Sequence, residues 1–83
     1  MATVTLYHYN YRPRLRLHYT LEMEVPIIGD KIHIPKQWFA ELGKEGKDEL
    51  FGIHFIVKER EMYFHEDESG DWRITLERCD GKI

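Results

Sequence analysis

The strongest constraint on the fold is a strict alternation of apolar and polar residues between positions 14 and 25. Alternation with a period of two is typical of a β-strand that buries one side and exposes the other. Twelve residues at about 3.3 Å each would extend roughly 40 Å, so a strand of this length is expected to bend within a small domain. The side predicted to face the core holds Leu15, Leu17, Tyr19, Leu21, Met23 and Val25.

The polar side of this segment changes sign along the chain. It carries Arg14, Arg16 and His18 first, and Glu22 and Glu24 after them. No acidic residue precedes Glu22, whereas the whole chain has a net charge of −3. A surface with one basic end favours orientation and choice of partner more than raw affinity.

Other segments predict further strands. Residues 3–11 are rich in Thr, Val and Tyr, which suit a pleated surface, but the pattern leaves open which side is buried. Alternating apolar residues also predict a short strand at 31–34 and a longer one at 50–60. Residues 62–77 predict a hairpin with an acidic tip, in which Gly70 supplies the turn.

Residues 35–43 predict one short helix. Pro35 suits the first helical turn, and Gly43 suits the position just after a helix. Between them, Trp38, Phe39 and Leu42 would share one face of the helix and pack against the sheet.

Together these elements predict one mainly β domain covering residues 1–83. We expect a small, strongly bent antiparallel sheet, or an open SH3-like or OB-like barrel, of five or six strands with one short helix. The hydrophobic content of 42% is sufficient for one core. No apolar run approaches the roughly 20 residues of a membrane-spanning helix, and the first residues lack the pattern of a secretory signal. The single cysteine, Cys79, excludes an internal disulfide framework, so we expect a cytoplasmic protein that does not associate with membranes.

Residues 25–32, read as VPIIGDKI, resemble the V-P-x-x-G-[DE]-x-[VI] turn–strand motif of small uncharacterised bacterial and phage proteins. In those proteins the motif precedes a barrel-like run of strands. The resemblance implies a small β-barrel and a bacterial or phage origin, and it assigns no functional residue.

The sequence lacks the motifs that mark common catalytic sites, such as G-x-S-x-G, a P-loop or H-E-x-x-H. We therefore expect no catalytic residues and no cofactor. The five histidines are widely spaced, and His8 and His18 are the pair that could meet across the first hairpin. Two ligands fall short of a zinc site, so we expect no bound metal.

The main prediction is a non-catalytic protein-binding module, a small regulatory or inhibitory protein that acts through a basic, tyrosine-rich strand surface. Tyr and Arg are enriched at the energetic centres of protein interfaces. The predicted binding residues are Tyr7, Tyr9, Tyr11, Arg12, Arg14, Arg16 and His18.

Two alternatives stay open at this point. Tyr7, Tyr9 and Tyr11 could stack on the bases of a nucleic acid while Arg12, Arg14 and Arg16 contact its phosphates. The acidic net charge argues against this alternative, because nucleic-acid-binding domains usually carry a basic excess. In addition, an unpaired edge strand could form a homodimer or join the sheet of a partner.

Overall fold

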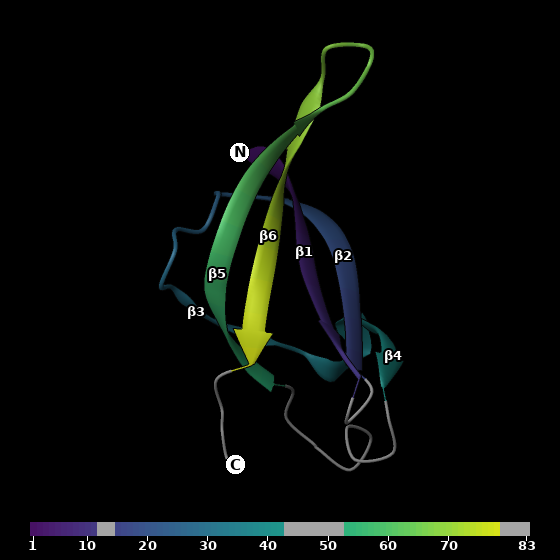
Figure 1. The fold of residues 1–83 in the computed structure, drawn as a ribbon, viewed down its shortest axis with the longest axis vertical. Helices are drawn as coiled ribbons and strands as arrows, with labels where there is room; N and C mark the ends of the chain where they lie inside the picture. The colour runs from purple at the N-terminus through teal and green to yellow at the C-terminus, as the bar shows by residue number, and fades with distance from the viewer. Residues whose placement is uncertain (12–14, 43–52, 79–83) are drawn as a thin grey trace.

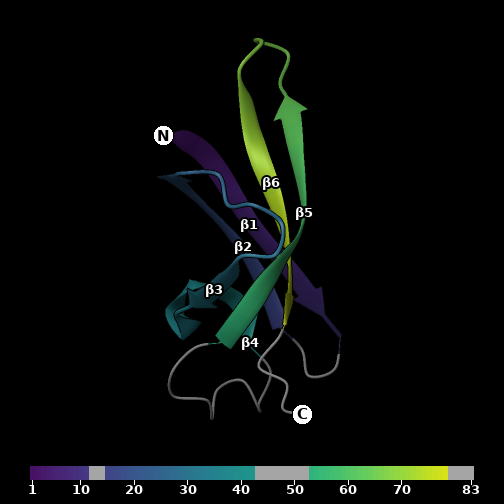
Figure 2. The same cartoon turned by 90° about the vertical axis from the view of Figure 1, so that its left-hand side faces the viewer.

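In a computed structural model, residues 1–11, 15–42 and 53–78 are described. They form one six-stranded sheet that curls into a half-barrel (Figures 1 and 2). The hairpin of β5 and β6 extends beyond the rest of the sheet. The elements are β1 (Ala2–Asn10), β2 (Leu15–Met23), β3 (Lys31–Ile34), the 3-10 turn η1 (Lys36–Trp38), β4 (Phe39–Leu42), β5 (Ile53–Phe64) and β6 (Gly70–Arg78).

The curl follows from how the chain joins the two edges of the sheet. The strand order is β3-β5-β6-β1-β2-β4, so β3 and β4 lie at opposite edges. In a flat sheet these edges would be about 24 Å apart, at roughly 4.8 Å per strand. The short connection from Ile34 to Phe39 spans at most about 18 Å even when fully extended, and it contains η1. The sheet must therefore bend until its edges approach one another.

The predicted fold class is confirmed: the described residues are mainly β, with six strands in a curled sheet. Four of the strand pairings are antiparallel. The fifth, between β1 and β6, is parallel and places Val4 beside Trp72 and Tyr7 beside Thr75. The sheet is therefore mixed. The last strand, β6, lies beside the first strand, β1, and runs parallel to it.

The helix predicted for residues 35–43 is wrong. One 3-10 turn forms, closed by the Trp38 N–H donating to the Pro35 carbonyl at 3.1 Å, and the chain then extends into β4. This strand pairs with β2, where Phe39 lies opposite Leu17. Hydrogen bonding to a neighbouring strand outweighs the weak local preference for helix. The Trp38 ring instead stacks on Tyr19, with ring centroids 4.1 Å apart and planes 10° apart.

The core lies inside the half-barrel and settles which side of each strand is buried. The predicted burial of Leu15 and Leu17 is confirmed, since neither has exposed surface. On β1 the inward side carries Val4, Leu6 and His8, so the tyrosines face outward. The buried hydrophobic residues are Val4, Leu6, Leu15, Leu17, Ile34, Phe55, Val57, Ile74 and Leu76.

β5 is one long strand that continues into the projecting hairpin. A register shift between Val57 and Glu59 inserts an extra residue against β6, and such bulges increase local bend and twist. The hairpin turn does not use Gly70 as predicted, because the residue with positive φ is Glu68, at 70°. Gly70 opens β6, where a Cβ atom would lie 2.9 Å from the Tyr63 carbonyl oxygen.

Candidate binding surface

The pairing of β1 with β2 brings four of the seven predicted binding residues together. Tyr7 lies opposite His18, and Tyr9 lies opposite Arg16. Directly opposed residues of paired strands project from the same face. This outer face is turned away from the core, and Tyr9, Arg16 and His18 are exposed on it while Tyr7 is half-buried.

The other three predicted residues follow β1 in the sequence. Tyr11 follows the strand and is 67% exposed. Arg12 and Arg14 lie outside the described residues. The structure therefore gathers Tyr7, Tyr9, Arg16 and His18 on one face.

Arg73 belongs to the same face and was not predicted. β6 runs parallel to β1, with Arg73 beside Thr5, and the Arg73 guanidinium lies over the Tyr7 ring, 4.3 Å from its centroid. In the sequence, Arg73 stands between the apolar residues Trp72 and Ile74, and this alternation predicts that Arg73 faces solvent. The alternation does not predict that β6 lies beside β1. We call Tyr7, Tyr9, Arg16, His18 and Arg73 the Tyr–Arg face.

Tyr7 is held in place from two sides. Arg73 covers one face of its ring, and the His18 ring approaches at 6.3 Å between centroids with planes at 82°. An arginine over a tyrosine ring is attracted by the electrons of the ring and contributes about 0.5–1 kcal/mol when exposed. These contacts favour one orientation of the Tyr7 side chain at the centre of the Tyr–Arg face.

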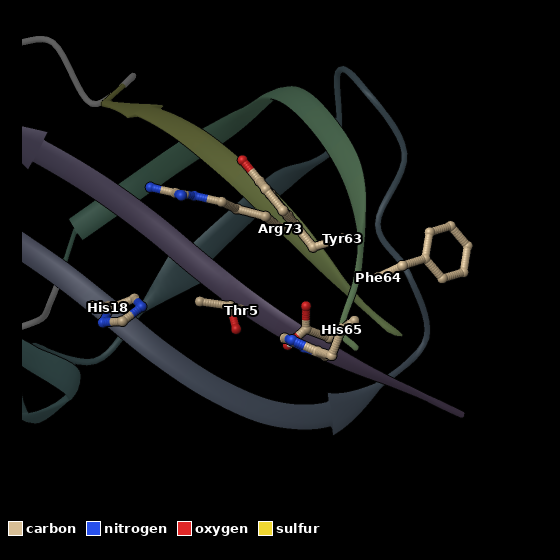
Figure 3. Close-up of a pocket in the computed structure, with 7 residues that line it drawn as sticks. Thr5, His18, Tyr63, Phe64, His65 and Arg73 are labelled. Carbon is tan, nitrogen blue, oxygen red and sulfur yellow. The ribbon is translucent and has the colours of Figure 1, made fainter. Parts of the chain in front are cut away.

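Tyr7 and Arg73 separate two hollows on the outer face. The first has a volume of about 220 Å³ and lies toward the projecting hairpin. Figure 3 shows that Arg73 and Tyr63 lie side by side in it, whereas the Phe64 ring points away from the other labelled residues. Its lining consists of Thr5, His18, Tyr63, Phe64, His65, Asp71 and Arg73.

The second hollow lies beside Tyr7 and Tyr9 and has a volume of about 460 Å³. An ion pair between Lys58 and Glu77, 3.3 Å from nitrogen to oxygen, forms part of its wall. Both partners of this ion pair are exposed, so it contributes little to stability.

The charge reversal seen in the sequence lies on one exposed strand side. Arg16 is exposed near one end of β2, and Glu22 is exposed near the other. The Thr3 hydroxyl donates a hydrogen bond to the Glu22 carboxylate at 2.7 Å. The basic end of the outer face therefore coincides with Tyr9, and the acidic end lies beyond the hollow that contains Arg73.

His8 and His18, which could have met across the first hairpin, lie on opposite faces of the sheet. His8 pairs with Leu17 and points into the core, whereas His18 pairs with Tyr7 on the outer face. His33 and His54 instead face one another across β3 and β5, with ring centroids 4.8 Å apart. Within the described ranges, no group of three or more His, Cys, Asp or Glu residues is arranged to hold a metal ion.

His8 is the buried polar residue of the described core and is 9% exposed. Its Nδ1 lies 2.9 Å from the Leu76 carbonyl oxygen. Because that oxygen can only accept, Nδ1 carries the proton and donates it. Nε2 has no hydrogen-bond partner, and the ring lies 4.8 Å from the Phe55 ring. Burial lowers the pKa of His8 below 6.5, against a smaller raising effect of the Leu76 hydrogen bond.

Comparisons with protein-family models, with curated proteins and with solved structures found no match. The part of the chain that the structure describes contains no helix of the length and apolar character needed to cross a membrane.

Proposed function

We propose that this chain is a non-catalytic protein-binding module that uses the Tyr–Arg face. The observation that carries the proposal is the β1–β2 register, which sets Tyr7 against His18 and Tyr9 against Arg16 on one solvent-facing surface. A small regulatory or inhibitory protein of bacterial or phage origin, acting in the cytoplasm, is the concrete form of the proposal. Its origin rests on the V-P-x-x-G-[DE]-x-[VI] resemblance of residues 25–32.

The composition and rigidity of the face support binding. Tyrosine offers a large contact area with few rotatable bonds, and arginine offers several hydrogen-bond donors. Because Arg73 and His18 hold the Tyr7 ring, that side chain loses little further freedom on binding. Tyr9 is 48% exposed and offers a partner an apolar surface that can still be buried.

The structure offers less support for nucleic acid as the partner. A base that stacks on Tyr7 would have to share the ring with Arg73, which already covers one side. Glu59 and Glu61, exposed on β5, pair with Thr75 and Arg73 and so border the same face. Carboxylates at these positions would repel phosphates. We therefore favour a protein partner and treat nucleic acid as an outcome of the test.

A homodimer through an edge strand remains a prediction. The edges are β3 and β4, and β1 lies inside the sheet between β6 and β2. The Tyr–Arg face would then stay free in a dimer that pairs edge to edge. Sedimentation velocity over a wide range of concentration measures this directly, since a monomer at every concentration excludes it.

The test compares two variants that both reverse one surface charge. In the first, Tyr9→Ala is combined with Arg16→Glu, two exposed residues that face one another across β1 and β2. In the control, Lys31→Glu changes an exposed residue of the edge strand β3. Each protein is immobilised, and the proteins it retains from bacterial lysates are quantified by mass spectrometry.

We expect a protein that is retained by the wild type and by Lys31→Glu but lost from the Tyr9→Ala, Arg16→Glu variant. Equal retention by all three proteins would contradict the proposal. Fluorescence anisotropy with single-stranded DNA and RNA forms the second arm. Binding that falls steeply between roughly 50 and 200 mM salt would replace the proposal with the nucleic-acid alternative.

A further inference from the structure

We infer that the hollow between Tyr63 and His18 is a carboxylate-binding site, in which Arg73 receives an Asp or Glu side chain of the partner protein. The inference rests on the proposed function and names the chemistry that this part of the face recognises. The hollow has a volume of about 220 Å³, which is room for one acidic side chain and some water.

The Arg73 guanidinium lies close to two tyrosine rings. It lies 4.3 Å from the centroid of the Tyr7 ring and 5.9 Å from that of Tyr63. Within residues 1–11, 15–42 and 53–78, no carboxylate forms an ion pair with it. Ring contacts occupy the face of a guanidinium but leave its N–H groups, which lie in the plane, available. A carboxylate matches that planar fork with two parallel hydrogen bonds.

Two further groups on the lining can contribute donors. His18 projects from β2 and contacts Tyr7 in a T-shaped ring arrangement. Thr5, which lies beside Arg73 across the β1–β6 pairing, shares a hydrogen bond of 2.8 Å with Thr20. Both residues are labelled in Figure 3; Thr5 lies on β1, the strand next to β6, and His18 lies on β2, one strand further along the sheet. An oxyanion at Arg73 would thus have other donors within the same hollow.

The neighbouring acidic residues favour a singly charged ligand. Asp71 lines the hollow and lies 3.5 Å from His65. Glu61 is the β5 partner of Arg73, and its carboxylate accepts a hydrogen bond of 3.4 Å from the Tyr63 hydroxyl. Two carboxylates near the site repel a phosphate, which carries close to two negative charges at neutral pH, more than a carboxylate, which carries one.

The experiment titrates the full chain, labelled with nitrogen-15, with three capped amino acids and follows the amide and guanidinium signals by NMR. The probes are acetyl-glutamate amide, the neutral acetyl-glutamine amide and acetyl-phosphoserine amide. We expect acetyl-glutamate amide to shift the signals of Thr5, His18 and Arg73, with a dissociation constant on the order of millimolar. The glutamine probe should leave these signals unchanged, and the phosphoserine probe should bind more weakly than glutamate.

Arg73→Gln should weaken glutamate binding by about tenfold or more, since it removes a charge-assisted contact. The matched control is Arg60→Gln. Arg60 lies on β5 with its guanidinium 4.8 Å from the Trp72 ring, and it pairs with the core residue Ile74, so it belongs to the opposite face. Arg73→Lys keeps the charge, and its weaker binding would show that the planar fork matters. The amide spectrum of each variant reports whether it is folded.

A glutamate probe that shifts no signal around Arg73, or that binds Arg73→Gln as well as the wild type, would overturn the inference. Tighter binding of phosphoserine would overturn the choice of carboxylate. A partner that is lost by the Tyr9→Ala, Arg16→Glu variant but kept by Arg73→Gln would refute this site while the proposed function stands. A partner kept by both variants would refute the proposed function, whatever the probes show.

Discussion

Because His8 of β1 is buried, we expect the free energy of unfolding to fall in mild acid. In the folded chain, burial lowers the pKa of His8 below 6.5, the value expected for an exposed histidine. The unfolded chain therefore takes up a proton at His8 before the folded chain does as the pH falls. The free energy of unfolding should decrease from pH 6.5 downward, until the pH reaches the folded-state pKa. Well above pH 6.5 both states are neutral at His8, and its contribution should be constant.

Proton linkage sets an upper limit on how steeply the free energy of unfolding can change with pH. One proton taken up only by the unfolded chain changes the free energy of unfolding by at most about 1.4 kcal/mol per pH unit. Protonation would put a positive charge on a ring whose Nε2 has no partner and which lies against Phe55. The Leu76 hydrogen bond and the Glu77 carboxylate offset the burial of that charge only in part, so the free energy of unfolding should fall with falling pH by less than this limit.

Urea unfolding, followed by the fluorescence of the half-buried Trp38 and Trp72, measures the slope between pH 8 and pH 5.5. The informative variant is His8→Asn, whose amide can still donate to the Leu76 carbonyl but does not titrate. It should lose most of the slope, whereas His18→Asn, on the exposed outer face, should keep it. An unchanged slope in His8→Asn, or a wild type whose stability is level from pH 6.5 to 5.5, would refute the assignment.

Three further substitutions test the packing and the hairpin. Leu17→Ala should cost about 2–5 kcal/mol in urea unfolding, because the side chain has no exposed surface; a loss below that range would mean that the site is loosely packed. Gly70→Ala should lower the melting temperature, since its Cβ would lie 2.9 Å from the Tyr63 carbonyl oxygen; an unchanged value would contradict this close approach. Hydrogen bonds from Ser69 lower the pKa of Asp67 below 3.8, so Ser69→Ala should raise that pKa in an NMR titration, and no movement would argue against the turn.

The part of the fold that depends on local pattern could be predicted from the sequence. Residues 14–25 alternate so regularly that the strand and its buried side followed directly, and β2 has Leu15 and Leu17 inside and Arg16 outside. A slip of one residue would turn the whole buried side to solvent. The hydrophobic effect therefore fixes this register strongly.

The predicted helix failed because its pattern fits two structures. Trp38, Phe39 and Leu42 can share a helix face, and the same segment can close the edge of a curled sheet. What decides between them is the pairing of Phe39 with Leu17, a contact between segments far apart in the sequence. Local propensity contains no information about that partner.

Sequence analysis predicted the residues of the Tyr–Arg face that lie on β1 and β2, and it missed Arg73 on β6. Tyr7, Tyr9, Arg16 and His18 belong to neighbouring strands, which sequence order suggests will pair. Arg73 reaches Tyr7 only through the parallel β1–β6 pairing. The burial of His8 was equally hidden, since either side of residues 3–11 could have faced the core.

The central claim is the β1–β2 register, and cross-strand nuclear Overhauser contacts between backbone protons test it most directly. We expect contacts that pair Tyr7 with His18 and Tyr9 with Arg16, together with His8 paired to Leu17. Contacts that pair His8 with His18 instead would shift the strands by one residue. That result would contradict the account, because the tyrosines of β1 and the basic residues of β2 could no longer share one exposed face.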